Sequence, residues 1–314
     1  LGSGENETFR VLDFFAYYSS LKKAFLNAQA QFNSEQLPDP ADSKSWGRWS
    51  TYAESLLVER DHLFQVATIT QGQIKKLNQA GILTMAQLAE SPPEKVVKGI
   101  NAPVFRRLQT QSRLQKASIG LPKPQFEIIN ATDEPKRGLA LLPPHSPLDV
   151  FFDIEGFPLE EDGLEYLWGV TFFNDQDIRD FKAFWAHNRD EEKKAFEDFI
   201  AWAYARWQQD PRMHIYHYAA YEITACRKLM GRFGVCEHEV DQLLRNEVFV
   251  DLYTVVKGGL LLGEPRYSIK NVEHLYRGKR AGNVASGGDS VVAYENFREL
   301  RAAREHVAAD GALK

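Results

Sequence analysis

The sequence predicts an α/β (α+β) protein with a mixed five-stranded sheet flanked by helices, preceded by a small helical domain. Three apolar runs with short connections predict an antiparallel meander of strands. These runs are 149–154, 166–173 and 181–186. A long helical pattern at 190–208 then leads to a strand at 213–218 and a helix from about 221 to 233. Because such crossovers are right-handed, the strand at 213–218 is expected beside the first strand and parallel to it.

The composition is that of a soluble globular protein. The 314 residues suffice for about two domains of roughly 150 residues, and no apolar run approaches the roughly 20 residues of a membrane span, so no membrane partner is expected. The two cysteines, Cys226 and Cys236, indicate neither a disulfide framework nor a cysteine metal cluster, and a cytoplasmic location follows by default. The net charge of −5 means that any nucleic-acid surface has to be a local patch.

Residues 1–60 are expected to form the first domain. Apolar residues at helical spacing across 9–32 predict one packing helix or two short ones, with Asp13 or a nearby residue as a candidate for the cap. A turn-forming, proline-containing segment follows. Trp46 and Trp49 come next, and we interpret them as core anchors rather than as a platform for nucleic-acid bases.

Residues 61–121 are expected to form a small helical domain around a hairpin of two helices. Gly81 can adopt the left-handed conformation that ends the first helix, and Thr84 can cap the second. The surrounding A-G-I-L-T phrase resembles the signature of a helix-hairpin-helix unit. Such units hold a DNA backbone through hairpin amides and nearby basic side chains, here Lys75 and Lys76 among others. The alternative is a structural spacer or a protein contact.

Six prolines between residues 121 and 147 resist a packed helix. They predict an extended linker over 122–146. The last domain is therefore expected to span 147–314.

Two acidic side chains, Asp153 and Glu155, follow the apolar start of the first strand of this domain. Residues i and i+2 of a strand point to the same side, so the two carboxylates share one face. Adjacent acids repel each other, but a divalent cation such as Mg²⁺ or Mn²⁺ would stabilise the pair because it prefers oxygen ligands. Taken alone, the pair is also typical of a solvated acidic turn.

The predicted topology calls for another acid just after the strand at 213–218, and Glu222 stands there. The end of that strand meets the Asp153 end of the first strand, where ligand sites of α/β sheets collect. Glu222 alone is typical of a carboxylate in the first turn of a helix. The joint occurrence of Asp153, Glu155 and Glu222 favours a metal site.

Five motifs in order extend this hypothesis across the last domain. They are F-D-I-E at 152–155, Y-H-Y-A-A-Y-E at 216–222, D-L-Y-T-V-V at 251–256, Y-S-I-K-N-V-E at 267–273 and S-V-V-A-Y at 290–294. The series resembles the YprB-like branch of the RNase H-like, DEDD-type exonuclease domains. The arrangement of the whole chain resembles RecB-like nucleases, which join a PD-(D/E)XK domain, a cysteine cluster, a helix-hairpin-helix and this domain. Residues 1–60 would hold the tail of the first of these.

The resemblance implies a 3′–5′ exonuclease that hydrolyses phosphodiester bonds of DNA or RNA. Asp153, Glu155 and Glu222 would be the catalytic residues and would hold two Mg²⁺ or Mn²⁺ ions. Other residues would support them or hold the nucleic acid. The supporting residues are Asp251, Tyr221 and His217, and the nucleic-acid-binding residues are Tyr267, Ser268, Lys270, Arg277 and Lys279 with Lys75 and Lys76. A helicase domain in the full-length protein is a candidate partner.

The chain departs from the family pattern at two places. The segment around Trp46 has no cysteines, so no iron–sulfur cluster is expected. The family's last catalytic acid follows the S-V-x-x-Y motif, and nothing matching it precedes Lys314. Since the chain also opens at Leu1 rather than at a methionine, we expect a fragment whose fourth ligand lies beyond Lys314, with weak or no activity. The alternative is a non-catalytic nucleic-acid-binding module serving an attached nuclease or helicase.

Overall fold

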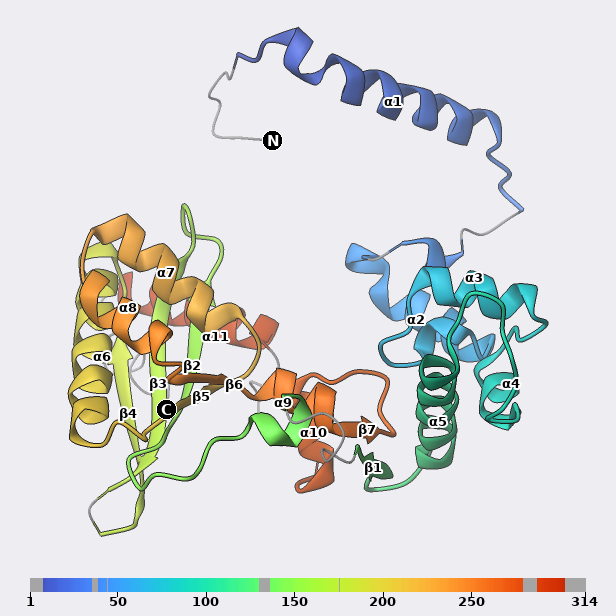
Figure 1. Ribbon diagram of the computed structural model, residues 1–314. Helices are drawn as coiled ribbons and strands as arrows, with labels where there is room; N and C mark the ends of the chain where they lie inside the picture. The colour runs from blue at the N-terminus through green and yellow to red at the C-terminus, as the bar shows by residue number, and fades with distance from the viewer. Residues whose placement is uncertain are drawn as a thin grey trace. The chain divides into compact units, whose positions relative to one another are not determined.

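The structure is a computed structural model, and it describes residues 8–35, 39–43, 45–129, 136–174, 176–278 and 287–302. The chain divides into two compact units, Leu1–Arg60 and Asp61–Lys314. Figure 1 shows the helices and strands of each unit, coloured along the chain. No helix in the described ranges is long and apolar enough to cross a membrane.

The first unit is helical. It contains α1 (Val11–Ala30), η1 (Pro40–Asp42), η2 (Gly47–Trp49) and α2 (Ser50–Glu59). The predicted helix over 9–32 is present as α1, but its N-cap is Arg10, and Asp13 lies inside the first turn rather than at the cap. Every described residue of α1 is exposed, so this helix packs on no described element of its own unit.

The two tryptophans of this unit differ in their surroundings. Trp46 is half-buried, and its indole N–H donates to the Pro40 carbonyl at 2.8 Å. Trp49 is 64% exposed and lies against the guanidinium of Arg48. The interpretation as a core anchor is therefore wrong for Trp49.

The Asp61–Lys314 unit begins with a helical part. It comprises η3 (Leu63–Gln65), α3 (Gln71–Gln79), α4 (Met85–Glu90) and α5 (Ala102–Ser118). Thr70 and Thr84 each close a capping box with a glutamine three residues later, which starts α3 and α4. Between them Gly81 has a φ of +79°, the left-handed conformation expected at this turn. Leu77 and Leu88 are fully buried in the core of this part, so the predicted hairpin of two helices is present.

The described parts of the proline-rich segment are anchored to the rest of its unit. β1 (Phe126–Ile128) pairs antiparallel with β7 (Leu260–Leu262). Further along, η5 (Gly138–Leu141) packs against α9 (Leu252–Gly259). The segment therefore ties the helical part to the sheet and is more than a spacer.

The sheet has five strands in the order β4-β3-β2-β5-β6. Their bounds are β2 (Val150–Phe157), β3 (Leu164–Phe173), β4 (Arg179–Trp185), β5 (Ile215–His217) and β6 (Phe249–Asp251). β2, β3 and β4 form an antiparallel meander, whereas β5 runs parallel to β2 and β6 parallel to β5. The predicted mixed five-stranded sheet, with a crossover helix between β4 and β5, is confirmed.

Three helices share one hydrophobic core with the sheet. They are α6 (Arg189–Gln209), α7 (Tyr221–Phe233) and α8 (Glu237–Arg245). In this core the ring of Phe152 stacks on that of Phe199 at 4.2 Å. A smaller core joins the β2–β3 hairpin to α11 (Gly287–Ala302), where Tyr294 stacks on Tyr166 at 3.8 Å. The remaining described elements are α10 (Ile269–Val272) and η6 (Glu273–Leu275).

Candidate active site

The register of β2 places its two acids on the face opposite the core. Phe152 and Ile154 are buried, whereas Asp153 is exposed and Glu155 is half-buried. Pairing with β5 covers only Val150 and Phe151, although pairing with β3 continues to Phe157. The acids therefore lie within β2, beyond its parallel partner, rather than at the end of the strand as predicted.

Glu222 meets Asp153 from the neighbouring element. It lies in the first turn of α7, directly after the loop that follows β5, and its side chain is buried. Burial, then the charge of Glu222, then that of Glu155 raise the pKa of Asp153 from 3.8 to about 7. A hydrogen bond from the Ile154 amide to Asp153 Oδ1 at 3.1 Å opposes this shift. The structure thus brings together Asp153 and Glu222, and Glu155 acts on Asp153 through its charge.

The loop between β5 and α7 is held by His217 and Asp251. Nδ1 of His217 donates to the Ala219 carbonyl at 2.6 Å and lies 3.4 Å from Glu222 Oε2. Ala219 has a φ of +72°, which is strained for a residue with a Cβ, and its amide donates to Asp251 Oδ1 at 2.8 Å. Asp251 also caps α9, with its carboxylate accepting from the Tyr253 amide. These contacts hold the backbone from which Glu222 projects.

Tyr221 extends the site towards the next strand. Its hydroxyl donates to Glu165 Oε2 at 2.7 Å, and burial raises the pKa of that carboxyl. A Cβ at position 156 would lie 2.4 Å from the Tyr221 hydroxyl, so glycine is required there for the pair to form. The pKa of Tyr221 is raised by burial, by Glu165, and then by Glu222 and Glu155. The hydroxyl therefore stays protonated and is a donor at neutral pH.

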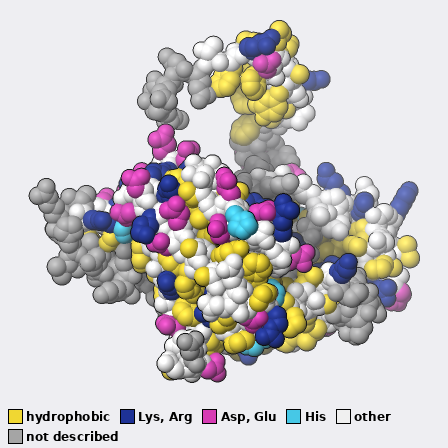
Figure 2. Space-filling view, turned by 60° about the vertical axis from the view of Figure 1, so that its left-hand side comes forward, with side chains coloured by type: hydrophobic (Ala, Val, Ile, Leu, Met, Phe, Trp, Pro, Cys, Tyr) yellow, Lys and Arg dark blue, Asp and Glu magenta, His cyan; other side chains and the backbone are white. Residues whose placement is uncertain are grey.

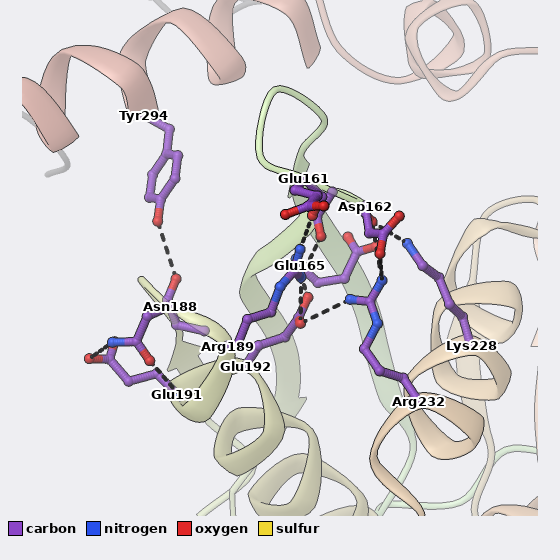
Figure 3. Close-up of polar contacts among 12 residues, drawn as sticks. Glu161, Asp162, Glu165, Asn188, Arg189, Glu191, Glu192, Lys228, Arg232 and Tyr294 are labelled. Carbon is purple, nitrogen blue, oxygen red and sulfur yellow. Dashed lines mark hydrogen bonds and ion pairs between the residues drawn. The ribbon is translucent and has the colours of Figure 1, made fainter. Parts of the chain in front are cut away.

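A polar network flanks Glu165, as Figure 3 shows. Glu192 of α6 accepts from Arg189 at 2.9 Å and lies 3.4 Å from Arg232 of α7. Its other oxygen accepts from the Glu165 amide at 2.7 Å. The network lies beside a cleft of about 560 Å³ whose lining includes Glu165, Tyr221 and Lys228.

Sequence reasoning missed Glu165 and this cleft. Glu165 interrupts the otherwise apolar start of β3, and an acid at a buried strand position is the signal that could have marked it.

The donor atoms at Asp153 and Glu222 suit a hard divalent cation. Glu222 Oε2 is buried and makes no hydrogen bond within the described ranges. The neighbouring negative charges contribute to the raised pKa of Asp153. A cation between the two carboxylates would give Glu222 Oε2 a partner and would stabilise the charged form of Asp153. Two carboxylates are in place, but the described residues contain no group of three His, Cys, Asp or Glu side chains close enough to hold a metal.

The predicted nucleic-acid-binding residues after α9 have different surroundings. Tyr267 is buried, and its hydroxyl bonds to Gln111 Oε1 and to the Leu260 carbonyl. The prediction that Tyr267 contacts nucleic acid is therefore wrong, since its side chain is a packing and hydrogen-bonding element of the interior. Ser268, Lys270 and Arg277 are exposed. Lys279 lies outside the described residues.

The backbone amides of the hairpin between α3 and α4 already have hydrogen-bond acceptors within the chain. Every amide from residue 81 to residue 86 donates to a group of this chain. At the start of α4 the Ala86 amide donates to the Asp61 carboxylate at 2.7 Å, and Lys116 Nζ lies 3.2 Å from the same carboxylate. The amides expected to hold a DNA backbone are therefore already engaged by acceptors within the chain, which argues against that expectation.

The two lysines predicted to assist at this hairpin differ in their surroundings. Lys75 is exposed, whereas Lys76 Nζ donates to the Gly99 carbonyl at 2.8 Å. Figure 2 shows basic and acidic side chains interspersed on the visible face, in keeping with a local rather than a global basic surface.

The strand order, the crossover helix and the acidic edge together define an RNase H-like α/β domain. The family model of the RNase H superfamily matches residues 150–308, slightly more than half of the chain. The chain therefore belongs to the RNase H superfamily, whose members are generally hydrolytic nucleases that typically use divalent metals. Searches of curated proteins and of solved structures found no match.

Proposed function

We propose that this chain carries the active site of a DEDD-type nuclease that removes nucleotides from the 3′ end of DNA or RNA. The contact between Asp153 and Glu222 is the observation that carries the proposal. Neither carboxylate is paired with a lysine or arginine of the described chain, so their repulsion is left for an external cation to relieve.

In this proposal Asp153, Glu155 and Glu222 hold two Mg²⁺ or Mn²⁺ ions. Bound ions of this kind lower the pKa of a water molecule and neutralise charge on the leaving oxygen. The chain's own residues position the carboxylates. His217 holds the loop before Glu222 through the Ala219 carbonyl, and Asp251 holds the same loop through the Ala219 amide.

The finer family assignment is part of the same proposal. The five ordered motifs support a YprB-like domain within a RecB-like arrangement, and with it a helicase partner and a cytoplasmic location. The helix-hairpin-helix would then contribute basic side chains such as Lys75 rather than its amides.

The test is a cleavage assay on a 5′-labelled oligonucleotide with Mn²⁺ or Mg²⁺. A ladder shortened from the 3′ end is expected from the full-length wild-type protein. Asp153→Asn and Glu222→Gln should lower the rate at least about 100-fold, because a ligand of the reacting cations is lost. The matched control is Asp190→Asn, an exposed carboxylate in the first turn of α6, which should leave the rate unchanged. Equal rates in the wild type and Asp153→Asn would sink the proposal.

A second candidate is a non-catalytic nucleic-acid-binding module. The absence of a closely gathered trio of metal-ligating side chains in the described ranges favours it. Such a module would bind oligonucleotides in a salt-sensitive way without responding to metal. A Mn²⁺-dependent rise in melting temperature that disappears in Asp153→Asn would decide for the nuclease.

A further inference from the structure

The two faces of the five-stranded sheet differ in what covers them. Phe152 of β2, Trp168 of β3 and Phe184 of β4 point into the core shared with α6, α7 and α8. Because side chains alternate along a strand, the residues between these point to the other face, which also carries Asp153. That face exposes three phenylalanine rings, namely Phe151 at 45%, Phe173 at 39% and Phe181 at 61%. Exposed apolar side chains gathered on one face are typical of an interaction site.

The pairing of the strands places Phe181 next to Asp153. Asp153 of β2 is paired with Gly169 of β3. A Cβ at position 169 would lie 3.4 Å from the ring of Phe181 and 3.9 Å from the Asp153 carbonyl oxygen. The ring of Phe181 therefore lies over the residue that is paired with Asp153, about one strand spacing, or roughly 5 Å, from that acid.

Phe151 extends the same surface across the sheet. Thr171 of β3 is paired with Phe151 on one side and with Phe181 on the other, so the three residues form one row. The ring of Phe151 stacks on that of Tyr216 of β5, with the ring centres 5.3 Å apart. Phe151 and Phe181 are thus held two strand spacings apart, about 10 Å, on the same face as Asp153.

Small side chains lie between the two rings. Gly169 is paired with Ala183 of β4, and both are half-buried beside Thr171. None of these three side chains is large enough to fill the space between Phe151 and Phe181. The surface therefore suits a flat, planar group that can lie against an aromatic ring.

The edge of the sheet favours a nucleic acid over another protein strand as the occupant. β4 is an edge strand, and it exposes three charged side chains, Arg179, Asp180 and Lys182. Charged side chains on an edge strand oppose pairing with a further strand. Arg179 precedes Phe181 by two residues, so it lies on the same face as the ring. An exposed cation beside an aromatic ring is typical of surfaces that bind single-stranded nucleic acid.

We propose that Phe181 and Phe151 form a stacking platform for the unpaired bases nearest the 3′ end of a single-stranded nucleic acid. The proposal rests on the proposed nuclease function and adds the form in which the substrate is bound. Aromatic side chains on an open sheet face stack two or three bases in RNA-binding domains of another fold. Stacking tolerates any base sequence, because every base has a π-face. A blunt duplex, whose bases are already stacked on each other, should bind poorly.

The test follows the fluorescence of 2-aminopurine, a base analogue whose emission falls when it stacks on a ring. Binding is measured in EDTA, so that hydrolysis plays no part. The probes are single strands of about 12 nucleotides, within the range that single-strand sites cover, with the analogue at the 3′ end or at the 5′ end. Phe181→Ala removes the ring beside Asp153. The matched control is Phe126→Ala in β1, a phenylalanine with an exposed fraction of 50%.

For the wild type we expect quenching of the analogue at the 3′ end and little at the 5′ end. Phe181→Ala should weaken binding about fivefold or more and remove the quenching, because one stacked base is lost. The slope of log affinity against log salt should not change in this variant, since no charge is removed, whereas Arg179→Gln should lower it by about 0.7. Phe181→Trp, which keeps a ring, and Phe126→Ala should both bind as the wild type does.

Equal binding and equal quenching in Phe181→Ala and Phe126→Ala would overturn the proposal. Binding of a blunt duplex as tight as that of the single strand would also overturn it. A further contrary outcome is a change of oligomeric state in Phe181→Ala, measured by sedimentation velocity, with oligonucleotide binding intact. In that case the face is a contact between protein chains.

The outcome is separable from that of the proposed function. Asp153→Asn should abolish hydrolysis in the cleavage assay and keep the quenching at the 3′ end. If Asp153→Asn leaves hydrolysis intact while Phe181→Ala loses the quenching, the nuclease assignment of Asp153 fails and the stacking platform stands.

Discussion

Two groups of carboxylates lie in the same domain and differ in how their charge is balanced. Glu192 is fully buried, and Arg189 and Arg232 supply its counter-charges from α6 and α7. Asp153 and Glu222 oppose only each other and Glu155, and the pKa of Asp153 rises to about 7. Glu192 and Glu222 are both buried. The difference is that Arg189 and Arg232 neutralise Glu192, whereas no lysine or arginine of the described chain pairs with Asp153 or Glu222.

The comparison separates structural acids from candidate ligands. A buried carboxylate that receives two guanidinium groups contributes to folding, because its removal strands those cations. Carboxylates that only repel each other destabilise the fold when no ligand is bound. Such an arrangement is retained at sites where a bound ligand offsets the repulsion. The predictions below test this difference from the largest expected effect to the smallest.

Glu192→Ala should lower the free energy of unfolding by about 3–5 kcal/mol. The reason is that Arg189 and Arg232 would lose their shared carboxylate while partly buried, and the Glu165 amide would lose its acceptor. Urea unfolding measures the change. Asp198→Ala on the same helix is the control, since it breaks an exposed pair with Lys194 and should cost less than about 1 kcal/mol. Similar losses of stability in both variants would contradict the special role of Glu192 as a buried structural acid.

Mn²⁺ should stabilise the wild type by about 2.7 kcal/mol when present at 100 times its dissociation constant. The effect should be larger at pH 8 than at pH 6, because a proton on Asp153, whose pKa is about 7, competes with the cation. Thermal unfolding with and without Mn²⁺ measures this shift, and Asp153→Asn should remove it. A shift that is larger at pH 6, or that survives in Asp153→Asn, contradicts the metal site.

Tyr221→Phe should destabilise the fold by about 1–3 kcal/mol, since the buried Glu165 carboxylate would lose its hydroxyl donor. Chemical denaturation monitors this loss. Tyr17→Phe, which removes an exposed hydroxyl of α1, should be close to neutral. If the two variants are equally stable, the Tyr221–Glu165 bond contributes nothing to the fold.

Asp153→Asn should stabilise the metal-free chain by on the order of 1 kcal/mol at pH 8, a modest figure because solvent screens an exposed side chain. The folded-state pKa of Asp153 lies above its usual value of 3.8, so the native state binds the proton more tightly between about pH 4 and pH 7. Wild-type stability therefore falls as pH rises through that window, and the gain in Asp153→Asn should shrink at pH 5. Melting temperatures at the two pH values measure it, and a gain that does not depend on pH would assign the effect to something other than this charge.

Much of the fold follows from local pattern. The alternation of β2 placed Asp153 and Glu155 on one face, and the crossover rule placed β5 beside β2. Both hold because side-chain direction in a strand and the hand of a crossover depend on backbone geometry alone. The capping boxes at Thr70 and Thr84 belong to the same class, since each involves residues three apart.

Contacts between distant segments could not be predicted in this way. Tyr267 was expected at a nucleic-acid surface because of its motif, but it packs inside against Gln111, more than a hundred residues earlier in the chain. Asp61 accepts from the Ala86 amide of the hairpin although it lies outside the hairpin motif. In both cases a neighbour from another element decided the role of the residue.

For this protein, the sequence by itself determined the order of elements from β2 to α7, the shared face of Asp153 and Glu155, and the place of Glu222 after β5. Tertiary structure decided that Glu222 touches Asp153 and that Arg189 and Arg232 neutralise Glu192. The physical reason is that periodicity and capping act between near neighbours in the chain. Charge balance depends instead on which distant side chains the packed elements bring within a few ångströms.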